Sequence, residues 1–275
     1  MAGPASSNLA VRLLTAAVGV PAILALLYEA PDWGFYALAF AAALVGCAEL
    51  FAMTHPGDRI GQGVGVALCA AASLALYFGG DDARIVRTVL IGVPLLGPLL
   101  TLARLGSLST AALRALALSA GPFLVAVPMT LLAIMKRDLG AQGPGTVILA
   151  LMLAWLGDTG GYFAGRFLGR HKLYEAVSPK KTVEGALGGL AGSVVGALFA
   201  SFISLRSLPV GHAILLGLVA GAAGQAGDLA ESLLKRSTGV KDSGSIVPGH
   251  GGILDRVDAL IFTSAVVYLD RLWLH

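Results

Sequence analysis

The sequence predicts an all-α, polytopic integral membrane protein, and three features of its composition support that fold class. Of its 275 residues, 56% are hydrophobic and only 13% are charged, whereas a typical soluble domain carries about 25% charged residues. With so few charges, most helices must be apolar on every side, which is typical of helices inside a membrane. The 37 glycines fit the same class, because small residues let transmembrane helices approach closely. The sequence also lacks the alternating ten-residue segments that are typical of a transmembrane β-barrel.

A membrane-crossing helix needs about 20 mostly apolar residues, and nine segments of the chain meet that requirement. The least regular part is 87–135, which is interrupted by Pro94, Pro98, Pro122 and Pro128. Such prolines kink transmembrane helices but are tolerated in them. The nine predicted spans are residues 10–28, 34–53, 62–79, 87–103, 114–135, 145–165, 184–205, 211–233 and 256–274.

Polar residues divide the chain into two parts of one continuous membrane domain. Residues 1–140 are predicted to be scaffold helices, whereas residues 141–275 form a catalytic half with two polar loops, 166–183 and 234–255. Two predicted spans separate these loops, so both lie on the same side of the membrane in either orientation. With the N-terminus inside, most of the 19 Lys and Arg residues fall on the inner side, as the positive-inside rule requires. We therefore expect a protein of the inner (plasma) membrane whose active site faces the cytoplasm.

Net charge and cysteine usage give no indication of nucleic-acid binding, of disulfide bonds or of a zinc site. The net charge of +3 is explained by the cytoplasmic bias of cations and by anionic substrates. No segment resembles a nucleic-acid-binding module, so nucleic acid is not an expected partner. Cys47 and Cys69 both fall inside apolar segments and predict neither a disulfide framework nor a zinc site.

Charge is concentrated on the helix that leads into the second polar loop. One face of that helix carries, at spacings i, i+3, i+4 and i+7, the residues Asp228, Glu231, Ser232 and Lys235. An ion pair from either acid to Lys235 would satisfy part of this stripe without any ligand. We favour a functional explanation, because the stripe runs straight on into further charge.

The loop beyond this helix and the start of the last span supply more polar groups. Five glycines follow Arg236, and glycine-rich turns can present backbone N–H groups to an anion. The last span then begins with Asp255 and Asp258, of which a helix cap would explain only one. Carboxylates from two helices, Asp228 and Asp255, with Asp258 nearby, suit a hard cation such as Mg²⁺. His250 is expected to contact phosphate or to shape the turn rather than to transfer protons.

The first polar loop offers a cationic counterpart. Between residues 157 and 169, glycine recurs at every fourth position, which provides a face for close helix packing within the chain or across a dimer. Asp158 lies beside that face. Farther on, Ser178 is followed by Lys180 and Lys181 just before a new helix, and both lysine and a helix start favour phosphate binding. Alone, this loop would indicate a surface for anionic lipid, but beside the second loop we favour a triphosphate. The P-loop and GxGxxG motifs are absent.

The N-terminal half offers one further candidate. Glu49 lies near the end of an otherwise apolar span. An acid within a membrane is a functional-site candidate by default, so Glu49 either lines the site or simply reaches the membrane surface.

At these residues the chain resembles the phosphatidate cytidylyltransferase family, also called CDP-diacylglycerol synthases. The family signature combines Ser-x-apolar-Lys-Arg, Lys-Asp, a glycine-rich turn, His-Gly-Gly and Asp-Arg-x-Asp, and it reads without a gap from Ser232 to Asp258. Val247 is a conservative departure, because the family more often has Leu, Ile or Phe there. Residues 158–166 and 178–185 also look like family motifs. The resemblance is sharp over 155–260, and the N-terminal half matches only in length and span pattern.

The resemblance implies a CTP-dependent nucleotidyltransferase of phospholipid synthesis, which converts CTP and phosphatidate to CDP-diacylglycerol and pyrophosphate at the lipid bilayer. It implies that Asp228 and Asp255 bind a metal centre containing Mg²⁺, to which K⁺ has also been linked in the family. A homodimer is left open. The catalytic set is Asp228, Asp255, Lys235, Arg236 and Arg256. The residues expected to bind the substrates are Asp158, Arg166, Ser178, Lys180, Lys181, Thr182, Glu184, Glu231, Ser232, Lys241, Asp242, His250, Gly251, Gly252 and Asp258.

Three other functions would also place charges in a membrane protein. A CDP-alcohol phosphotransferase needs the motif Asp-x-x-Asp-Gly-x-x-Ala-Arg, which this sequence lacks. A CTP-dependent lipid kinase would transfer the γ-phosphate rather than the α-phosphate, so its product would differ. A transporter would commonly show repeated halves with broken helices at the midplane, whereas here the charges gather in two loops on one side.

Overall fold

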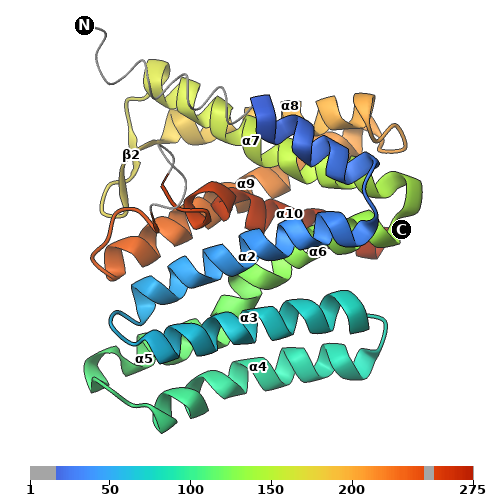
Figure 1. Ribbon diagram of the computed structural model, residues 1–275. Helices are drawn as coiled ribbons and strands as arrows, with labels where there is room; N and C mark the ends of the chain where they lie inside the picture. The colour runs from blue at the N-terminus through green and yellow to red at the C-terminus, as the bar shows by residue number, and fades with distance from the viewer. Residues whose placement is uncertain (1–16, 245–250, 275) are drawn as a thin grey trace, which may run out of the picture.

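The computed structural model describes residues 17–244 and 251–274, which form a bundle of long helices (Figure 1). A short helix over Ala17–Tyr28 comes first. The N-terminal half then contains α2 (Asp32–Thr54), α3 (Arg59–Gly79), α4 (Ala83–Ala103), α5 (Leu108–Gly121), the π-helical turn η1 (Pro122–Ala126) and α6 (Val127–Asp138). The C-terminal half contains the 3₁₀ turn η2 (Gly140–Gln142), α7 (Gly143–Leu168), β1 (Lys172–Tyr174), β2 (Ser178–Thr182), α8 (Val183–Ile203), α9 (Val210–Ser237) and α10 (Leu254–Leu274). The all-α class is confirmed, with one small antiparallel hairpin, β1–β2, in the first polar loop.

Seven of the described helical segments are long and apolar enough to cross a membrane. They correspond to the second to eighth predicted spans, and α5, η1 and α6 together make one of them, Leu108–Asp138. The first and last predicted spans are not among the seven. The described part of the first is the short helix Ala17–Tyr28, and α10 carries charged residues near both of its ends. A polytopic membrane fold is therefore confirmed, whereas the count of nine spans is not.

The prolines of the least regular region do not end the spans. Helix α4 continues through Pro94 and Pro98. Pro98 has no N–H to donate to the carbonyl of Pro94, and the hydroxyl of Ser119 on α5 donates to that carbonyl instead, at 2.7 Å. Pro122 begins the π-helical turn η1, which joins α5 to α6. Neighbouring groups and local helix adjustments thus accommodate these prolines.

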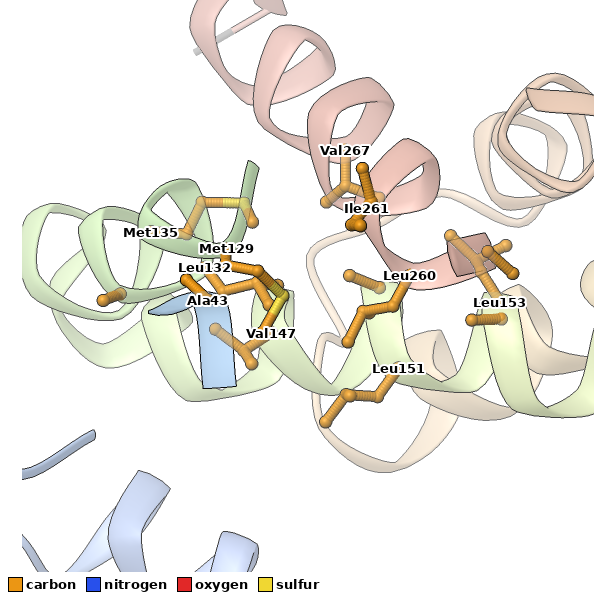
Figure 2. Packing of buried hydrophobic residues seen from close by; sticks show 14 of the residues in the cluster. Ala43, Met129, Leu132, Met135, Val147, Leu151, Leu153, Leu260, Ile261 and Val267 are labelled. Atoms are coloured by element: carbon orange, nitrogen blue, oxygen red, sulfur yellow. The ribbon is translucent and has the colours of Figure 1, made fainter. Parts of the chain in front are cut away.

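The apolar core joins helices from both halves of the chain. Figure 2 shows Ala43 of α2, Leu132 of α6 and Val147 of α7 packed together, with Leu153 of α7 and Leu260 of α10 farther along. Ala43, Val147 and Leu153 are fully buried. Between membrane helices, such contacts stabilise the fold through close packing rather than by removing apolar surface from water.

Helices α7 and α8 make the most extensive contact between any two elements described, and glycines allow it. A Cβ atom on Gly160 would lie 2.4 Å from the carbonyl oxygen of Gly188, and one on Gly161 would lie 3.4 Å from that of Gly185. A side chain at Gly160 would push the two helices apart, whereas a Cβ atom at Gly161 would make an ordinary close contact. The glycine face at 157–169 therefore packs against α8 within the same chain.

Candidate active site

Both polar loops lie at the same end of the bundle, as the sequence predicts. Figure 1 shows the β1–β2 hairpin and the α9–α10 connection at one end, with the C-terminus at the other. An ion pair links the hairpin to α9, because Lys181 Nζ lies 2.7 Å from Asp228 Oδ2. The two charged segments thus belong to one site.

The start of α8 holds the hairpin in place. Thr182 caps this helix by accepting a hydrogen bond from the N–H of Gly185, at 3.0 Å. Glu184 accepts hydrogen bonds from the N–H groups of Arg170 and His171, at 3.0 and 3.2 Å, and pairs with the His171 ring at 2.6 Å. The structure therefore places Glu184, an expected substrate ligand, on the backbone that follows α7.

A cavity of about 340 Å³ opens between α7, the hairpin, α8 and α9, and we call it the polar cavity because charged side chains line it, although most of its wall is apolar. Its volume falls within the range of about 300–1,000 Å³ that is usual for small-molecule sites. The glycine faces of α7 and α8 form part of its wall, so missing side chains create the room. Its polar lining is supplied by Asp158, Tyr162, Arg166, Lys180, Lys181, Thr182, Gln225 and Asp228.

Three carboxylates gather beside this cavity, those of Asp228 and Glu231 on α9 and Asp258 on α10. One oxygen atom from each lies within 4.8 Å of the other two. Neither oxygen of Glu231 has a hydrogen-bond partner among the described residues, although Oε2 lies 2.6 Å from Lys235 Nζ. Like charges this close repel one another unless a cation or protons compensate them. Oxygen donors of this kind fit a hard divalent cation.

Lys235 lies between this acidic cluster and Asp255. Its Nζ atom is 2.6 Å from Glu231 Oε2 and 2.5 Å from Asp255 Oδ1, and its side chain is 10% exposed. The second oxygen of Asp255 accepts hydrogen bonds from the N–H groups of Ser243 and Gly252, at 3.0 and 3.1 Å. The Glu231–Lys235 ion pair that the helical spacing allows is therefore present, but Lys235 serves two acids.

The sequence pairs Asp228 with Asp255 as metal ligands, and the structure arranges these acids differently. Asp228 joins the group that contains Asp258, whereas both oxygens of Asp255 already bind groups of the protein. Sequence spacing could not decide this, because it does not say which side of α10 faces α9. A metal held by Asp228 and Asp255 stays a prediction.

The other predicted residues fall into four groups. Arg236 donates hydrogen bonds to the carbonyls of Val177 and Val240, at 3.4 and 3.2 Å, and so ties the end of α9 to both polar loops. Ser232 is buried on α9, and His250 lies outside the described residues. Among the predicted residues not yet placed, those at least partly exposed are Ser178, Lys241, Asp242, Gly251 and Arg256.

The sequence left one cavity residue unidentified and did not decide where Glu49 lies. Gln225 lines the cavity, and its Nε2 donates to the carbonyl of Ala186 at 3.0 Å. An amide inside an apolar span was a usable signal. Glu49, which could have reached the membrane surface instead, is buried against the α9–α10 connection.

A second, mainly apolar cavity of about 160 Å³ adjoins the acidic cluster. Its walls include Leu50, Val125 and Phe262, and two of its polar lining residues are Glu231 and Asp258. Since Asp228 lines the first cavity, the acidic cluster stands between a polar cavity and an apolar one.

These features define a class of protein, a helical membrane protein with a charged cavity of small-molecule size beside a cluster of carboxylates. Residues 10–272 match the sequence model described as the Cytidylyltransferase family. The match extends over nearly the whole chain, so the protein belongs to this family, and the resemblance noted in the sequence is confirmed.

Several curated proteins that the chain resembles are named phosphatidate cytidylyltransferase. The chain is 50% identical over 122 residues to a phosphatidate cytidylyltransferase of Synechocystis, a match that covers 44% of this chain and 41% of that protein. It is 46% identical over 122 residues to one of Staphylococcus haemolyticus, covering 44% and 47%. It is 42% identical over 132 residues to one of Bacillus subtilis, covering 48% and 49%. In each case the chain spans less than half the length of the relative that it matches.

Proposed function

We propose that this protein transfers the cytidylyl group of CTP to phosphatidate, which gives CDP-diacylglycerol and pyrophosphate for phospholipid synthesis. Membership of the Cytidylyltransferase family and the names of the matched relatives support this activity. The observation that carries the proposal is the acidic cluster between a polar and an apolar cavity. One substrate of this reaction is a charged nucleotide, the other is a lipid, and their phosphates must meet at one point.

The polar cavity suits the nucleotide. Lys180, Lys181 and Arg166 line it and would pair with the triphosphate, since lysine and arginine are common phosphate ligands. Asp228 is at present the partner of Lys181, so the triphosphate would compete with this acid for the lysine. That exchange would release the Asp228 carboxylate for another partner.

The apolar cavity suits the lipid. Part of its wall comes from α2, η1 and α9, which belong to segments long and apolar enough to cross a membrane, and the rest comes from α10, so an acyl chain could remain in an apolar setting. The phosphate of phosphatidate would then approach the acidic cluster from the side of Glu231 and Asp258. A single chain supplies every residue named, so the proposal does not require a homodimer.

The acidic cluster fits Mg²⁺, because that ion commonly takes one or two carboxylates together with substrate phosphates. Asp228 and Asp258 would hold the ion, and Lys235 would keep Glu231 and Asp255 in place beside it. When bound, Mg²⁺ supplies positive charge that neutralises the phosphates during transfer. K⁺ is a further candidate ion at the same centre.

The reaction mainly requires that the two substrate phosphates are positioned and that their negative charge is compensated. A phosphate oxygen of phosphatidate attacks the α-phosphorus of CTP and forms the new P–O bond. The bond to the β-phosphate breaks, and its electron pair leaves with pyrophosphate. The attacking phosphate is already an anion near neutral pH, so no general base is required. Lys180 and Lys181 would stabilise the charge on the triphosphate as this bond breaks.

The polar end of the bundle would face the cytoplasm of the inner (plasma) membrane. The cytoplasm supplies CTP, and the Lys and Arg bias of the sequence favours this side.

The test is direct synthesis by the purified full-length protein in phosphatidate-containing vesicles. We expect label from α-³²P-CTP in the lipid fraction as CDP-diacylglycerol, and no lipid label from γ-³²P-CTP. We also expect no product in EDTA, recovery with Mg²⁺, and, if K⁺ takes part, a lower rate when Na⁺ replaces it. Label from γ-³²P-CTP in the lipid would indicate a lipid kinase instead, and the absence of labelled lipid with either nucleotide would refute the proposal.

A further inference from the structure

A buried acid from the N-terminal half holds the beginning of α10. Glu49 lies on α2, five residues before its end at Thr54, and its side chain is only 4% exposed. A buried carboxylate is costly unless hydrogen bonds or charges compensate it. Its partners therefore show what it does in the fold.

Among the described residues, the hydrogen-bond partners of Glu49 all belong to the α9–α10 connection or to the first residue of α10. Its Oε1 accepts a hydrogen bond from the N–H of Ile253 at 3.0 Å, and its Oε2 accepts one from the N–H of Leu254 at 2.8 Å. The hydroxyl of Ser243 lies 3.0 Å from Oε2. The first N–H groups of a helix have no partner within that helix, so Glu49 caps α10 from a different helix. Its negative charge also interacts favourably with the helix dipole.

The glycines of the connection make room for this carboxylate. A Cβ atom on Gly244 would lie 2.5 Å from Glu49 Oε1, and one on Gly252 would lie 2.4 Å from Oε2. Any larger residue at either position would displace the acid. Contact with the Glu49 carboxylate thus explains two glycines of this turn without a bound phosphate.

A continuous chain of polar contacts leads from Glu49 to the acidic cluster. The Ser243 hydroxyl lies within hydrogen-bond distance of both Glu49 Oε2 and Asp255 Oδ2, at 3.0 and 2.9 Å, and its single proton can serve either acid. Asp255 pairs with Lys235, which pairs with Glu231 of the cluster.

We propose that Glu49 is a positioning residue, which fixes the start of α10 so that Asp255 and Asp258 are held correctly against α9. The kinetic test of this inference rests on the proposed function, whereas its hydrogen-exchange test does not. It gives the N-terminal helices a part in the site, although Glu49 does not line either of the two cavities beside the acidic cluster.

The test compares Glu49→Gln with the wild type by hydrogen exchange and by kinetics. Gln keeps the size of the side chain but presents an NH₂ group to N–H donors. We expect amide exchange in residues 251–258 to rise at least about tenfold, since hydrogen bonds to a charged group are lost. We expect kcat to fall about 10- to 100-fold, as is typical when support of a metal site is removed, with little change in the KM for CTP.

Asp32→Asn is the matched control, because Asp32 lies at the other end of α2 and pairs with the buried Lys136 at 2.9 Å. This variant should lower the melting temperature without changing exchange in 251–258 or kcat. If it reproduces the effects of Glu49→Gln, general destabilisation of α2 explains them and the inference fails. If Glu49→Gln does not accumulate, Ser243→Ala removes only the shared hydroxyl and should produce the same changes at smaller amplitude.

Unchanged exchange in residues 251–258 would overturn the positioning role regardless of activity. Raised exchange with an unchanged kcat would also overturn it, because the start of α10 would then not matter for catalysis. If the wild-type protein makes no CDP-diacylglycerol, the proposed function fails, while the exchange comparison still decides whether Glu49 holds α10.

Discussion

Two lysines at the same end of the molecule pair with carboxylates in contrasting ways. Lys235, on α9, is nearly buried and lies between two acids, Glu231 and Asp255. Lys181, on the β1–β2 hairpin, is 27% exposed and pairs with one acid, Asp228, at the edge of the polar cavity. A buried pair holds groups in fixed positions, because breaking it leaves an uncompensated charge. An exposed pair is weak and can be exchanged for another partner. We therefore expect the α9–α10 region to hold its acids in place and the hairpin to exchange its acid for a bound anion.

The largest expected effect comes from the acids that the α9–α10 region presents. Asp228→Asn and Asp258→Asn should each lower kcat by about 10²–10³-fold, the usual cost of losing one electrostatic contact to a transition state. Titration of activity with Mg²⁺ should show a higher requirement in both. Asp81→Asn, an exposed acid between α3 and α4, is the control and should behave as the wild type.

The variant Asp255→Asn distinguishes a metal site formed by Asp228 and Asp255 from one formed by Asp228 and Asp258. If Asp255 only balances Lys235 and anchors the turn, this variant should lose stability while keeping the Mg²⁺ requirement of the wild type. A raised Mg²⁺ requirement equal to that of Asp258→Asn would instead favour Asp255 as a ligand, as the sequence suggested.

The next effect is on protein stability, which should differ between variants of Lys235 and Lys181. Lys235→Met should lower the free energy of unfolding by about 3–5 kcal/mol, because it leaves Glu231 and Asp255 without their cation. Lys181→Met should lower it by less than about 1 kcal/mol, because the pair is partly exposed. Denaturant titration in detergent measures both. Equal losses would mean that the two ion pairs do not differ as their burial indicates.

The smallest effect is on nucleotide binding. Lys181→Met and Lys180→Met should each raise the KM for CTP by about tenfold, which corresponds to about 1.4 kcal/mol of lost interaction, with a smaller change in kcat. The KM of the wild type should also rise with salt, because partly exposed charges are screened. Lys172→Met, on the opposite strand of the hairpin and bonded to the carbonyl of Pro179, is the control. If the KM for CTP is unchanged in both Lys180→Met and Lys181→Met, the triphosphate binds elsewhere.

Much of the fold could be predicted because its signals are local. Apolar segments of the right length predicted seven of the spans that the structure describes. Because two of these spans separate the two polar loops, both loops were predicted at one end. The glycine repeat at 157–169 predicted close packing but not its partner, because the sequence does not show which helix lies opposite. The β1–β2 hairpin was missed, since three- and five-residue strands carry almost no periodic signal.

The site was predictable in its residue types and less so in its pairings. Lys181 and Asp228 were both identified, but only the structure shows that they form an ion pair. Gln225 was overlooked although a polar amide in an apolar helix is unusual. Glu49 lies 194 residues before Ser243 in the chain, and no local pattern connects the two.

The sequence by itself determined that this protein is a helical membrane protein, that its charges gather in two loops on one side, and which motifs carry the family resemblance. These properties follow from composition and from short-range spacing, because the cost of placing a charge in a membrane is incurred residue by residue. Only the tertiary structure decided which acids meet. Asp255 and Asp258 are about 60° apart around their helix, so a modest rotation of α10 would exchange their roles. Packing against α9, and the cap that Glu49 supplies from α2, select the rotation in which Asp258 joins Asp228 and Asp255 binds Lys235.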